Sequence, residues 1–470
     1  MTKTDAELLS IAHASAADGE SEHEPEPHEA TDIFNAYLFL EQHGNRVRWC
    51  EQLRAWFIWD ERRWAEDRSG TIRKLAHETV LSLADMAADA YPKNEDARKR
   101  LLKAAIASEA SMRVSNMLRE AKVPSVCVRA EDLDRDKELL VVRNGMIDLR
   151  RGDLLSFSPD LLGTRITDID YDPSATCPKF RQALNLWLSN DHETAEFIKR
   201  AFGMSLTGRG DSKAFPFLTG HGDNGKTTLM ETLAMVVGEY GRATSVNIIL
   251  AGQYKGEANT PFLAELRGAR FVYTGEMPEN AKLHAARLKD ITGGGTITAM
   301  AKYGTPFDLK LNCVLWSYGN YQPAIVDDSV GLWRRMRLVP FTHIFPVEDQ
   351  RPTEDLLAEF REELPGILRW AVEGAMEALA VGVGTSPMIT EATSVYRAEQ
   401  DVVGQWITQK LEKGAGFSID KKAAMTSYRD FCEAEGTKPL SIGSVTKRLR
   451  RRGIYTDISS RKYLGVRLRE

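Results

Sequence analysis

The chain has 470 residues, 43% of them hydrophobic, and a formal net charge of −5 at pH 7. This length allows roughly two to four domains with hydrophobic cores, and without a global excess of positive charge any surface that attracts nucleic acid must be local. The five cysteines lie far apart, which argues against a zinc cluster or a disulfide framework. No segment approaches the about 18 apolar residues of a membrane-spanning helix, and the N-terminus lacks the apolar core of a signal peptide, so we expect a cytoplasmic protein.

The N-terminal part is predicted to be a tail followed by an α-rich domain. Residues 1–30 are rich in Ala, Ser and Glu and are expected to form a disordered acidic tail. Within residues 31–177, the segment AWFIWDERRWAED predicts a β-hairpin, and apolar positions at helical spacing predict helices over 72–87 and 95–121. The Asn-Gly and Gly-Asp turns of ELLVVRNGMIDLRRGDLLSF then predict a β-meander.

Residues 178–385 have the pattern of an α/β domain. A predicted helix over 178–207 precedes the short apolar runs FPFLT, ARFVYTG, LNCVLWSYGN and MRLVPF, which alternate with polar helical stretches. This alternation is typical of a mostly parallel sheet covered by helices.

Residues 386–470 form the last predicted domain. Helices are expected from Asp420 through Glu435 and from Ser441 through Arg452, and a two-stranded ribbon is expected in IYTDISSRKYLGVRLRE. This order of elements predicts a C-terminal winged helix.

The segment GHGDNGKT fits the pattern G-x-x-x-x-G-K-[ST] between an apolar strand and a helix. Glycines allow backbone N–H groups to surround phosphate oxygens, and the helix N-terminus adds its dipole. In this pattern Lys226 bridges the terminal phosphates of ATP and Thr227 binds Mg²⁺. His221 is interpreted as an ordinary loop residue. The predicted nucleotide-binding residues are Gly220, Gly222, Asn224, Gly225, Lys226, Thr227 and Thr228.

Polar residues at the ends of the other apolar runs complete the predicted catalytic set of Lys226, Glu276, Asn320, Arg334 and Arg335. Glu276 ends RFVYTGE, where a strand would deliver an acid to metal or water; a solvated loop acid is the alternative. Asn320 either positions the attacking water or senses the γ-phosphate, with the cap of a turn as the alternative. The two arginines precede a strand, where they either reach a phosphate bound by a neighbouring subunit or form surface salt bridges.

Two regions are predicted to bind DNA. Glycine-rich and β-favouring pieces flank Lys302 and Tyr303, which predicts a hairpin whose tip contacts a phosphate and stacks on a base; an ordinary exposed turn is the alternative. The last 24 residues carry a net charge of +7, which favours contact with duplex phosphates over a merely solvated face. The DNA-binding residues predicted there are Lys447, Arg448, Arg450, Arg451, Arg452, Arg461 and Lys462.

The segments GHGDNGKTTLM, RFVYTGEMPEN, LKDITGGGTITAMAKYGTPF, LWSYGN and GLWRRMRLVPF, in this order, resemble the phage and plasmid primase-helicases of superfamily 3. The similarity extends backward, because LLVVRNGMIDLRRGDL and TDIDYDPSATCPKF resemble the poxvirus-type primase N-terminal helper region that precedes this helicase core. It extends forward through VYRAEQDVVGQWI to the C-terminal segment.

The resemblance implies an AAA+ P-loop ATPase core that works as a ring, with a hexamer expected, ATP between subunits and single-stranded DNA in the central channel. It implies that Lys226 and Thr227 belong to Walker A, that Glu276 is the Walker B acid and binds metal or activates water, and that Asn320 is sensor 1. Either Arg334 or Arg335 would then act on the neighbouring subunit's nucleotide. One departure is that Gly275 stands where many P-loop ATPases carry a second acid.

These features predict an ATP-dependent DNA helicase, expected to move 3′ to 5′, that replicates a phage, prophage or plasmid. The alternative is an initiator that binds origin DNA and uses its ATPase for assembly. The chain leaves no room for a primase-polymerase domain, so we expect a separate primase or polymerase as partner. Asp168 and Asp170 form the only acidic pair that suggests such a domain, and without a partner histidine they are interpreted as a structural strand end.

Overall fold

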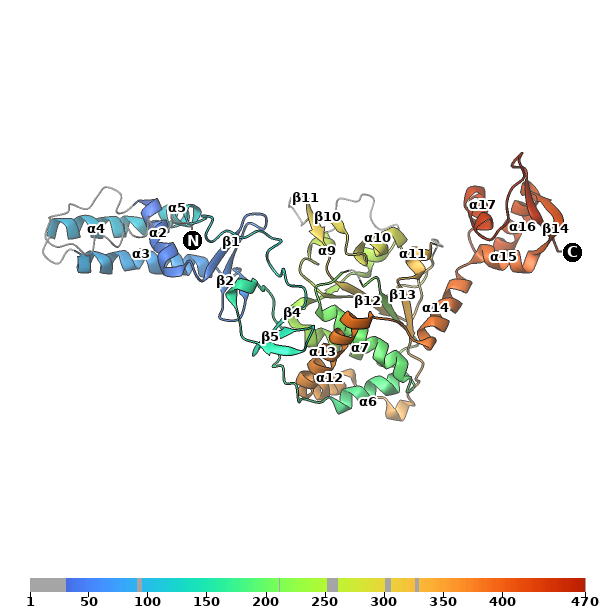
Figure 1. Ribbon diagram of the computed structural model, residues 1–470, viewed down its shortest axis with the longest axis horizontal. Coiled ribbons are helices and arrows are strands. Elements are labelled where there is room, and N and C mark those ends of the chain that lie inside the picture. Colours follow the sequence, from blue (N-terminus) through green and yellow to red (C-terminus); the bar gives the residue numbers. More distant parts are fainter. Residues whose placement is uncertain are drawn as a thin grey trace. The chain divides into compact units, whose positions relative to one another are not determined.

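The computed structural model describes residues 31–90, 95–210, 212–251, 261–300, 306–325 and 329–469 (Figure 1). It divides into two units, Met1–Tyr171 and Asp172–Glu470. The predicted acidic tail lies outside the described residues. The boundaries proposed for the finer domains stay predictions.

The first unit begins with helices around a small antiparallel sheet. Its elements, in chain order, are α2 (Asp32–His43), β1 (Val47–Cys50), β2 (Ala55–Trp59), β3 (Trp64–Glu66), α3 (Thr71–Ala90), α4 (Glu95–Ser108) and α5 (Ser111–Glu120). The predicted hairpin is confirmed as β2 and β3, and β1 adds a third strand on the other side of β2. The rings of Trp49 and Trp56 pack 5.3 Å apart in the core beneath the helices.

The predicted meander is also confirmed, as β4 (Leu139–Val142), β5 (Gly145–Asp148) and β6 (Asp153–Leu155). A short 3₁₀ helix, η1 (Pro159–Leu161), follows. The turn residue Asn144 is fixed by the far end of this unit, since its side chain accepts from the Tyr171 amide at 2.9 Å and donates to the Tyr171 carbonyl at 3.1 Å.

The second unit is built on a five-stranded parallel sheet of order β13-β7-β12-β9-β8. Its strands are β7 (Phe215–Thr219), β8 (Gly241–Thr244), β9 (Phe271–Glu276), β12 (Val314–Gly319) and β13 (Met336–Pro340). The apolar runs in the sequence therefore become β7, β9, β12 and β13, and the mixed α/β class is confirmed.

Helices and a hairpin accompany this sheet (Figure 1). They are α6 (Pro178–Trp187), α7 (His192–Leu206), α8 (Lys226–Val237), η2 (Gly238–Tyr240), η3 (Val246–Ile249), α9 (Pro261–Ala264), α10 (Ala285–Ile291), β10 (Thr296–Met300), β11 (Pro306–Lys310), α11 (Val330–Trp333), η4 (Val347–Asp349), α12 (Thr353–Glu362), α13 (Leu364–Val381) and α14 (Pro387–Glu399). The strands β10 and β11 pair antiparallel, which confirms the arms of the predicted hairpin.

The C-terminal segment has its own hydrophobic core, which includes Trp406, Tyr428 and Tyr463. Its elements are α15 (Val402–Lys410), β14 (Leu411–Asp420), α16 (Lys421–Ala434), α17 (Ile442–Arg451) and β15 (Lys462–Leu468). The last two helices match the prediction, and Asp420 caps α16 by accepting from the Lys422 amide at 2.8 Å.

The predicted C-terminal ribbon is only partly correct. β15 pairs mainly with β14, which the sequence analysis missed, and the expected ribbon is reduced to an isolated bridge between Thr456 and Tyr463 with the hydrogen bonds on either side of it. The winged helix stays a prediction. Among the described residues, no helix is both long and apolar enough to cross a membrane.

Candidate functional site

The glycine-rich turn joins β7 to α8 in the interior of the sheet. All five residues of β7 are buried, and β13 and β12 flank the strand. Gly225 has a φ of 87° and directly precedes Lys226, the first residue of α8. Glycine adopts this left-handed backbone at little cost, and the first N–H groups of a helix have no partners within the helix. The turn thus places helix-start donors beside the carboxyl end of the strand.

The turn itself holds the ammonium group of Lys226. Nζ donates to the carbonyl oxygens of Gly220 and His221 at 2.9 and 2.7 Å and to Asn224 Oδ1 at 2.6 Å. The lysine is only 6% exposed. An anion bound by the helix-start donors would compete with these three acceptors for the ammonium group.

Electrostatic interactions link Lys226 to Glu276 at the end of β9. Burial lowers the pKa of Lys226 to about 8, while the negative charges of Glu276 and Asp223 oppose this shift. A carboxylate stabilises a charged lysine only at short range, so Glu276 belongs to the same site.

Two contacts from outside the turn fix its shape. Asn224 is 3% exposed, and its Nδ2 donates to the Phe341 carbonyl at 2.8 Å, directly after β13. On the other side, a Cβ at Gly225 would lie 2.3 Å from the Trp187 ring of α6. The turn is therefore held between α6 and the end of β13.

Glu276 and Asn320 lie at the same edge of the sheet as the glycine-rich turn, because β7, β9 and β12 are parallel. A register shift in the β9–β12 pairing sets Glu276 opposite Tyr318, and a hydrogen bond of 2.7 Å joins the buried Thr274 and Ser317 hydroxyls behind it. Glu276 and Asn320 are both exposed. The structure thus brings Lys226, Glu276 and Asn320 to one edge, as predicted from the strand ends.

Tyr318 is a site residue that the sequence analysis missed. It lies on β12, where its hydroxyl hydrogen bonds with Thr227, and its pKa is raised by burial, then by the charge of Glu231 and, to a smaller extent, by that of Glu276. Its position one residue before Gly319 in LWSYGN was the available signal, because the last side chains of a strand at this edge face the ligand side of an open α/β sheet.

The two arginines have different environments. Arg335 is half-buried, donates from Nε to Thr292 Oγ1 at 3.0 Å and from a terminal nitrogen to the Gly331 carbonyl at 2.8 Å. Arg334 is exposed at the end of α11. Arg335 therefore braces the elements around it, whereas Arg334 offers its guanidinium to the surface.

The structure describes only some of the predicted DNA-binding residues, and not all of those are exposed. Lys302 and Tyr303 lie outside the described residues. Arg448 is 7% exposed, and Arg452 pairs with Asp401. The prediction for these two arginines is therefore corrected. They support the fold of the C-terminal segment and do not lie freely on its surface. The residues that remain on the exposed basic surface are Lys447, Arg450, Arg451, Arg461 and Lys462.

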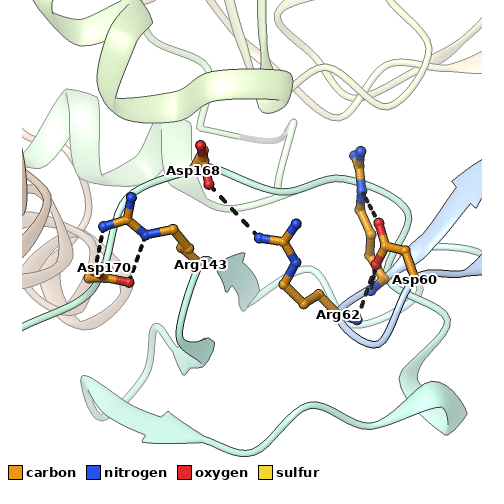
Figure 2. Close-up of polar contacts among 6 residues, drawn as sticks. Asp60, Arg62, Arg143, Asp168 and Asp170 are labelled. Carbon is orange, nitrogen blue, oxygen red and sulfur yellow. Dashed lines mark hydrogen bonds and ion pairs between the residues drawn. The ribbon is translucent and has the colours of Figure 1, made fainter.

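Figure 2 shows the acidic pair of the first unit among arginines. Arg143 donates from Nε to Asp170 Oδ1 at 2.9 Å and from a second nitrogen to Oδ2, and this hydrogen bonding lowers the pKa of Asp170. Asp168 lies 3.9 Å from Arg62, and the neighbouring Asp60 pairs with the arginine that follows Arg62. The predicted strand end is corrected: Asp168 and Asp170 follow an isolated bridge between Val142 and Thr167 and not a strand, and both carboxylates are paired with arginine. Within the described ranges, no group of three or more His, Cys, Asp or Glu side chains could hold a metal ion.

Two parts of the chain match known families, and viral proteins are similar to it. Residues 36–188 match the family described as D5 N terminal like, and residues 218–335 match a family of unknown function, DUF5906. A protein of Acanthamoeba polyphaga mimivirus, provisionally named a helicase, is 26% identical over 314 residues, which cover 61% of this chain and 32% of the relative. A protein of African swine fever virus, provisionally named a primase, is 26% identical over 235 residues, covering 44% of this chain and 23% of the relative.

The chain spans less than a third of the length of either viral relative. Among solved structures, the apo A form of the NrS-1 C-terminal region matches with a TM-score of 0.51 and 11% identity, over 93% of this chain and 100% of that one. This likeness shows a shared fold.

Fold and site define a mixed α/β protein with a glycine-rich strand–helix turn at the edge of a parallel sheet. The family match over residues 36–188 and the similarity to the viral relatives are consistent with a D5-type primase-helicase.

Proposed function

We propose that this chain is an ATP-dependent DNA helicase of superfamily 3 that serves the replication of a phage, prophage or plasmid and moves 3′ to 5′. One observation carries the proposal: Lys226, Thr227, Tyr318 and Glu276 lie together where three parallel strands end. The provisional names of the viral relatives, helicase and primase, support a role in replication.

The turn fits a nucleotide phosphate. It is a cradle that side chains would fill, because a Cβ at Gly220 would lie 2.3 Å from the Phe341 carbonyl oxygen and one at Gly225 would strike Trp187. The helix-start N–H groups would bind the phosphate oxygens, and Lys226 would exchange its loop acceptors for the β- and γ-phosphates. Thr228 is buried behind this position, 3.5 Å from the Thr353 hydroxyl.

Thr227 and Glu276 would hold Mg²⁺, which when bound supplies charge neutralisation at the phosphates. Glu276 and Asn320 would orient the water that attacks the γ-phosphate, since both side chains are exposed at the sheet edge. Arg334 would reach the nucleotide of a neighbouring subunit, because Arg335 is already engaged inside its own subunit. Nucleotides shared between subunits require a ring, for which we propose a hexamer.

DNA would be engaged at two places. Lys302 and Tyr303, between the arms β10 and β11, would contact single-stranded DNA in the ring channel, and the exposed basic side chains of the C-terminal segment would bind duplex or origin DNA. A separate primase or polymerase would start synthesis.

A strand-displacement assay tests the proposal. With ATP and Mg²⁺, the protein is expected to unwind a duplex with a 3′ single-stranded tail and to leave one with a 5′ tail intact, while single-stranded DNA stimulates hydrolysis. Lys226→Ala is expected to lose unwinding because the phosphate loses its cation. Hydrolysis that ignores single-stranded DNA would contradict the helicase.

The second candidate is an origin-binding initiator, favoured by the net charge of +7 in the last 24 residues. It predicts stable binding to origin DNA and ATP-dependent assembly without strand displacement. The same assay, read beside sedimentation of the protein with origin DNA, separates the two.

A further inference from the structure

Residues 457–462, the tip turn, connect Thr456 to β15. Hydrogen bonds of Asp457 hold the two ends of this turn together. The Asp457 amide donates to the Lys462 carbonyl at 3.0 Å, the Lys462 amide donates to Asp457 Oδ1 at 2.8 Å, and the Ser460 amide donates to the Asp457 carbonyl at 3.0 Å. Ser460 adopts a left-handed φ of 57°. With this bonding the tip turn has a defined shape before it meets any partner.

This constrained turn presents an apolar side chain at its apex. Ile458 has a relative exposure of 107%, the largest among the exposed large hydrophobic residues of the described chain. Tyr455 and Leu464, 58% and 43% exposed, are linked by a hydrogen bond of 2.9 Å from the Leu464 amide to the Tyr455 carbonyl. Single exposed hydrophobic residues are common on protein surfaces, but three around one rigid turn form a patch with a fixed geometry.

The tip turn and helix α17 form one rigid frame. The Tyr463 hydroxyl hydrogen bonds with Thr446 Oγ1 of α17 at 2.7 Å, and Val445, Leu449 and Tyr463 share one buried core. The exposed cations of α17 and those of the tip turn therefore keep a fixed spacing.

The charges around the patch indicate its partner. Arg461 and Lys462 belong to the tip turn itself, Lys447 and Arg450 lie exposed on α17, and the last 24 residues have a net charge of +7. A protein partner that covers an apolar patch does not require a cationic rim, whereas DNA offers phosphates on both sides of a groove with apolar stacked bases inside.

We propose that the tip turn inserts Ile458 into the minor groove of duplex DNA, where it wedges between base pairs while Arg461 and Lys462 contact the flanking phosphates. Aliphatic wedges of this kind partly unstack a base step and kink the duplex. The inference rests on the proposed binding of duplex DNA by the C-terminal segment and names the residue that enters the bases.

The experiment measures binding of the full chain to a short blunt duplex without nucleotide, by fluorescence anisotropy at several salt concentrations. Ile458→Ala is expected to bind about tenfold more weakly because buried aliphatic surface is lost, with an unchanged salt dependence because no charge is removed. Lys462→Gln is expected to lower the slope of log affinity against log salt by about 0.9. Ile458→Leu keeps an aliphatic wedge and retains affinity, and Ile106→Ala, at another exposed isoleucine, is the matched control.

A duplex with an interior 2-aminopurine reports the wedge directly, since its fluorescence rises on unstacking with the wild type and stays low with Ile458→Ala. Equal affinity and equal 2-aminopurine signal for the wild type and Ile458→Ala would overturn the wedge, and a normal effect of Lys462→Gln in the same series would leave the proposed DNA binding intact. A wild type without duplex affinity would overturn both. Loss of self-association in Ile458→Ala without DNA would assign the patch to a second copy of the chain and overturn the wedge.

Discussion

Replacement of Gly225 by alanine tests the geometry of the glycine-rich turn. The added methyl group would lie 2.3 to 2.4 Å from three ring atoms of Trp187, at a backbone φ of 87°. Trp187 is 2% exposed and packs against the Phe360 ring with a centroid distance of 6.1 Å, so it has little room to move. A left-handed alanine costs about 1–2 kcal/mol and overpacking about 1–3 kcal/mol, which gives a local loss of about 2–5 kcal/mol.

Gly222→Ala is the matched control in the same turn, because a Cβ there meets nothing within 4 Å and the backbone is not left-handed. Its effect is expected to stay within about 0.5 kcal/mol. Because the perturbation is local, amide hydrogen exchange at the start of α8 reports it more directly than global unfolding does. At the lower bound of about 2 kcal/mol, the amides at the start of α8 should exchange roughly thirtyfold faster in Gly225→Ala.

A second change separates the two costs. Trp187→Leu in the Gly225→Ala background removes the ring that the methyl group strikes but leaves the left-handed backbone, so exchange should slow by the overpacking part alone. If Gly225→Ala and Gly222→Ala exchanged at the same rate, the assignment of α6 as the wall of the turn would be refuted.

Three further predictions concern the proposed catalytic residues. The folded pKa of Lys226 lies near 8, below its ordinary value of 10.5, so the unfolded chain binds more protons between these pH values. The free energy of unfolding of the empty protein should therefore rise with pH in this window by roughly 1.4 kcal/mol per unit of pKa difference, and urea titrations should show no such rise in Lys226→Met. Glu276→Gln should retain nucleotide affinity and lose most hydrolysis in steady-state kinetics, and equal loss of both would contradict its role. Arg334→Ala should lower hydrolysis at unchanged thermal stability, whereas Arg335→Ala should lose about 1–2 kcal/mol of stability with its bonds to Thr292 and Gly331; the reverse pattern would exchange the two roles.

Much of the sheet was predictable because its strands are continuous apolar runs that end in polar residues. Parallel strands buried on both faces read in this way, and their ends at Glu276 and Asn320 followed from the run lengths alone. The strand β8 was not predicted because its sequence GRAT is short and largely polar. It occurs as an edge strand, where one neighbour and partial exposure suffice.

The unpredicted contacts join residues far apart in the sequence. Asn224 and Phe341 meet because β13 lies beside β7, and no local pattern carries that register. The strand β14 was missed for a related reason: KGAGFSID contains two glycines and few buried positions, and the strand is completed by pairing with β15. The sequence showed which residues are chemically suited to a site. Tertiary contacts determined that Arg335 is held by hydrogen bonds to its neighbours and that Arg448 is buried.

In the ring that we propose, the hydrogen bond from Asn224 to the Phe341 carbonyl would have a consequence for communication between subunits. The strand β13 begins just after Arg335 and ends just before Phe341, so it forms a rigid connection about 17 Å long between the arginine pair and the phosphate-binding turn. A movement of the turn toward a bound anion would displace the Phe341 end of β13. This displacement would shift the other end of the strand, where Arg334 faces outward. In an assembled ring, such a strand would act as a mechanical linkage through which occupancy of one binding site is felt at the next without rearrangement of a whole domain.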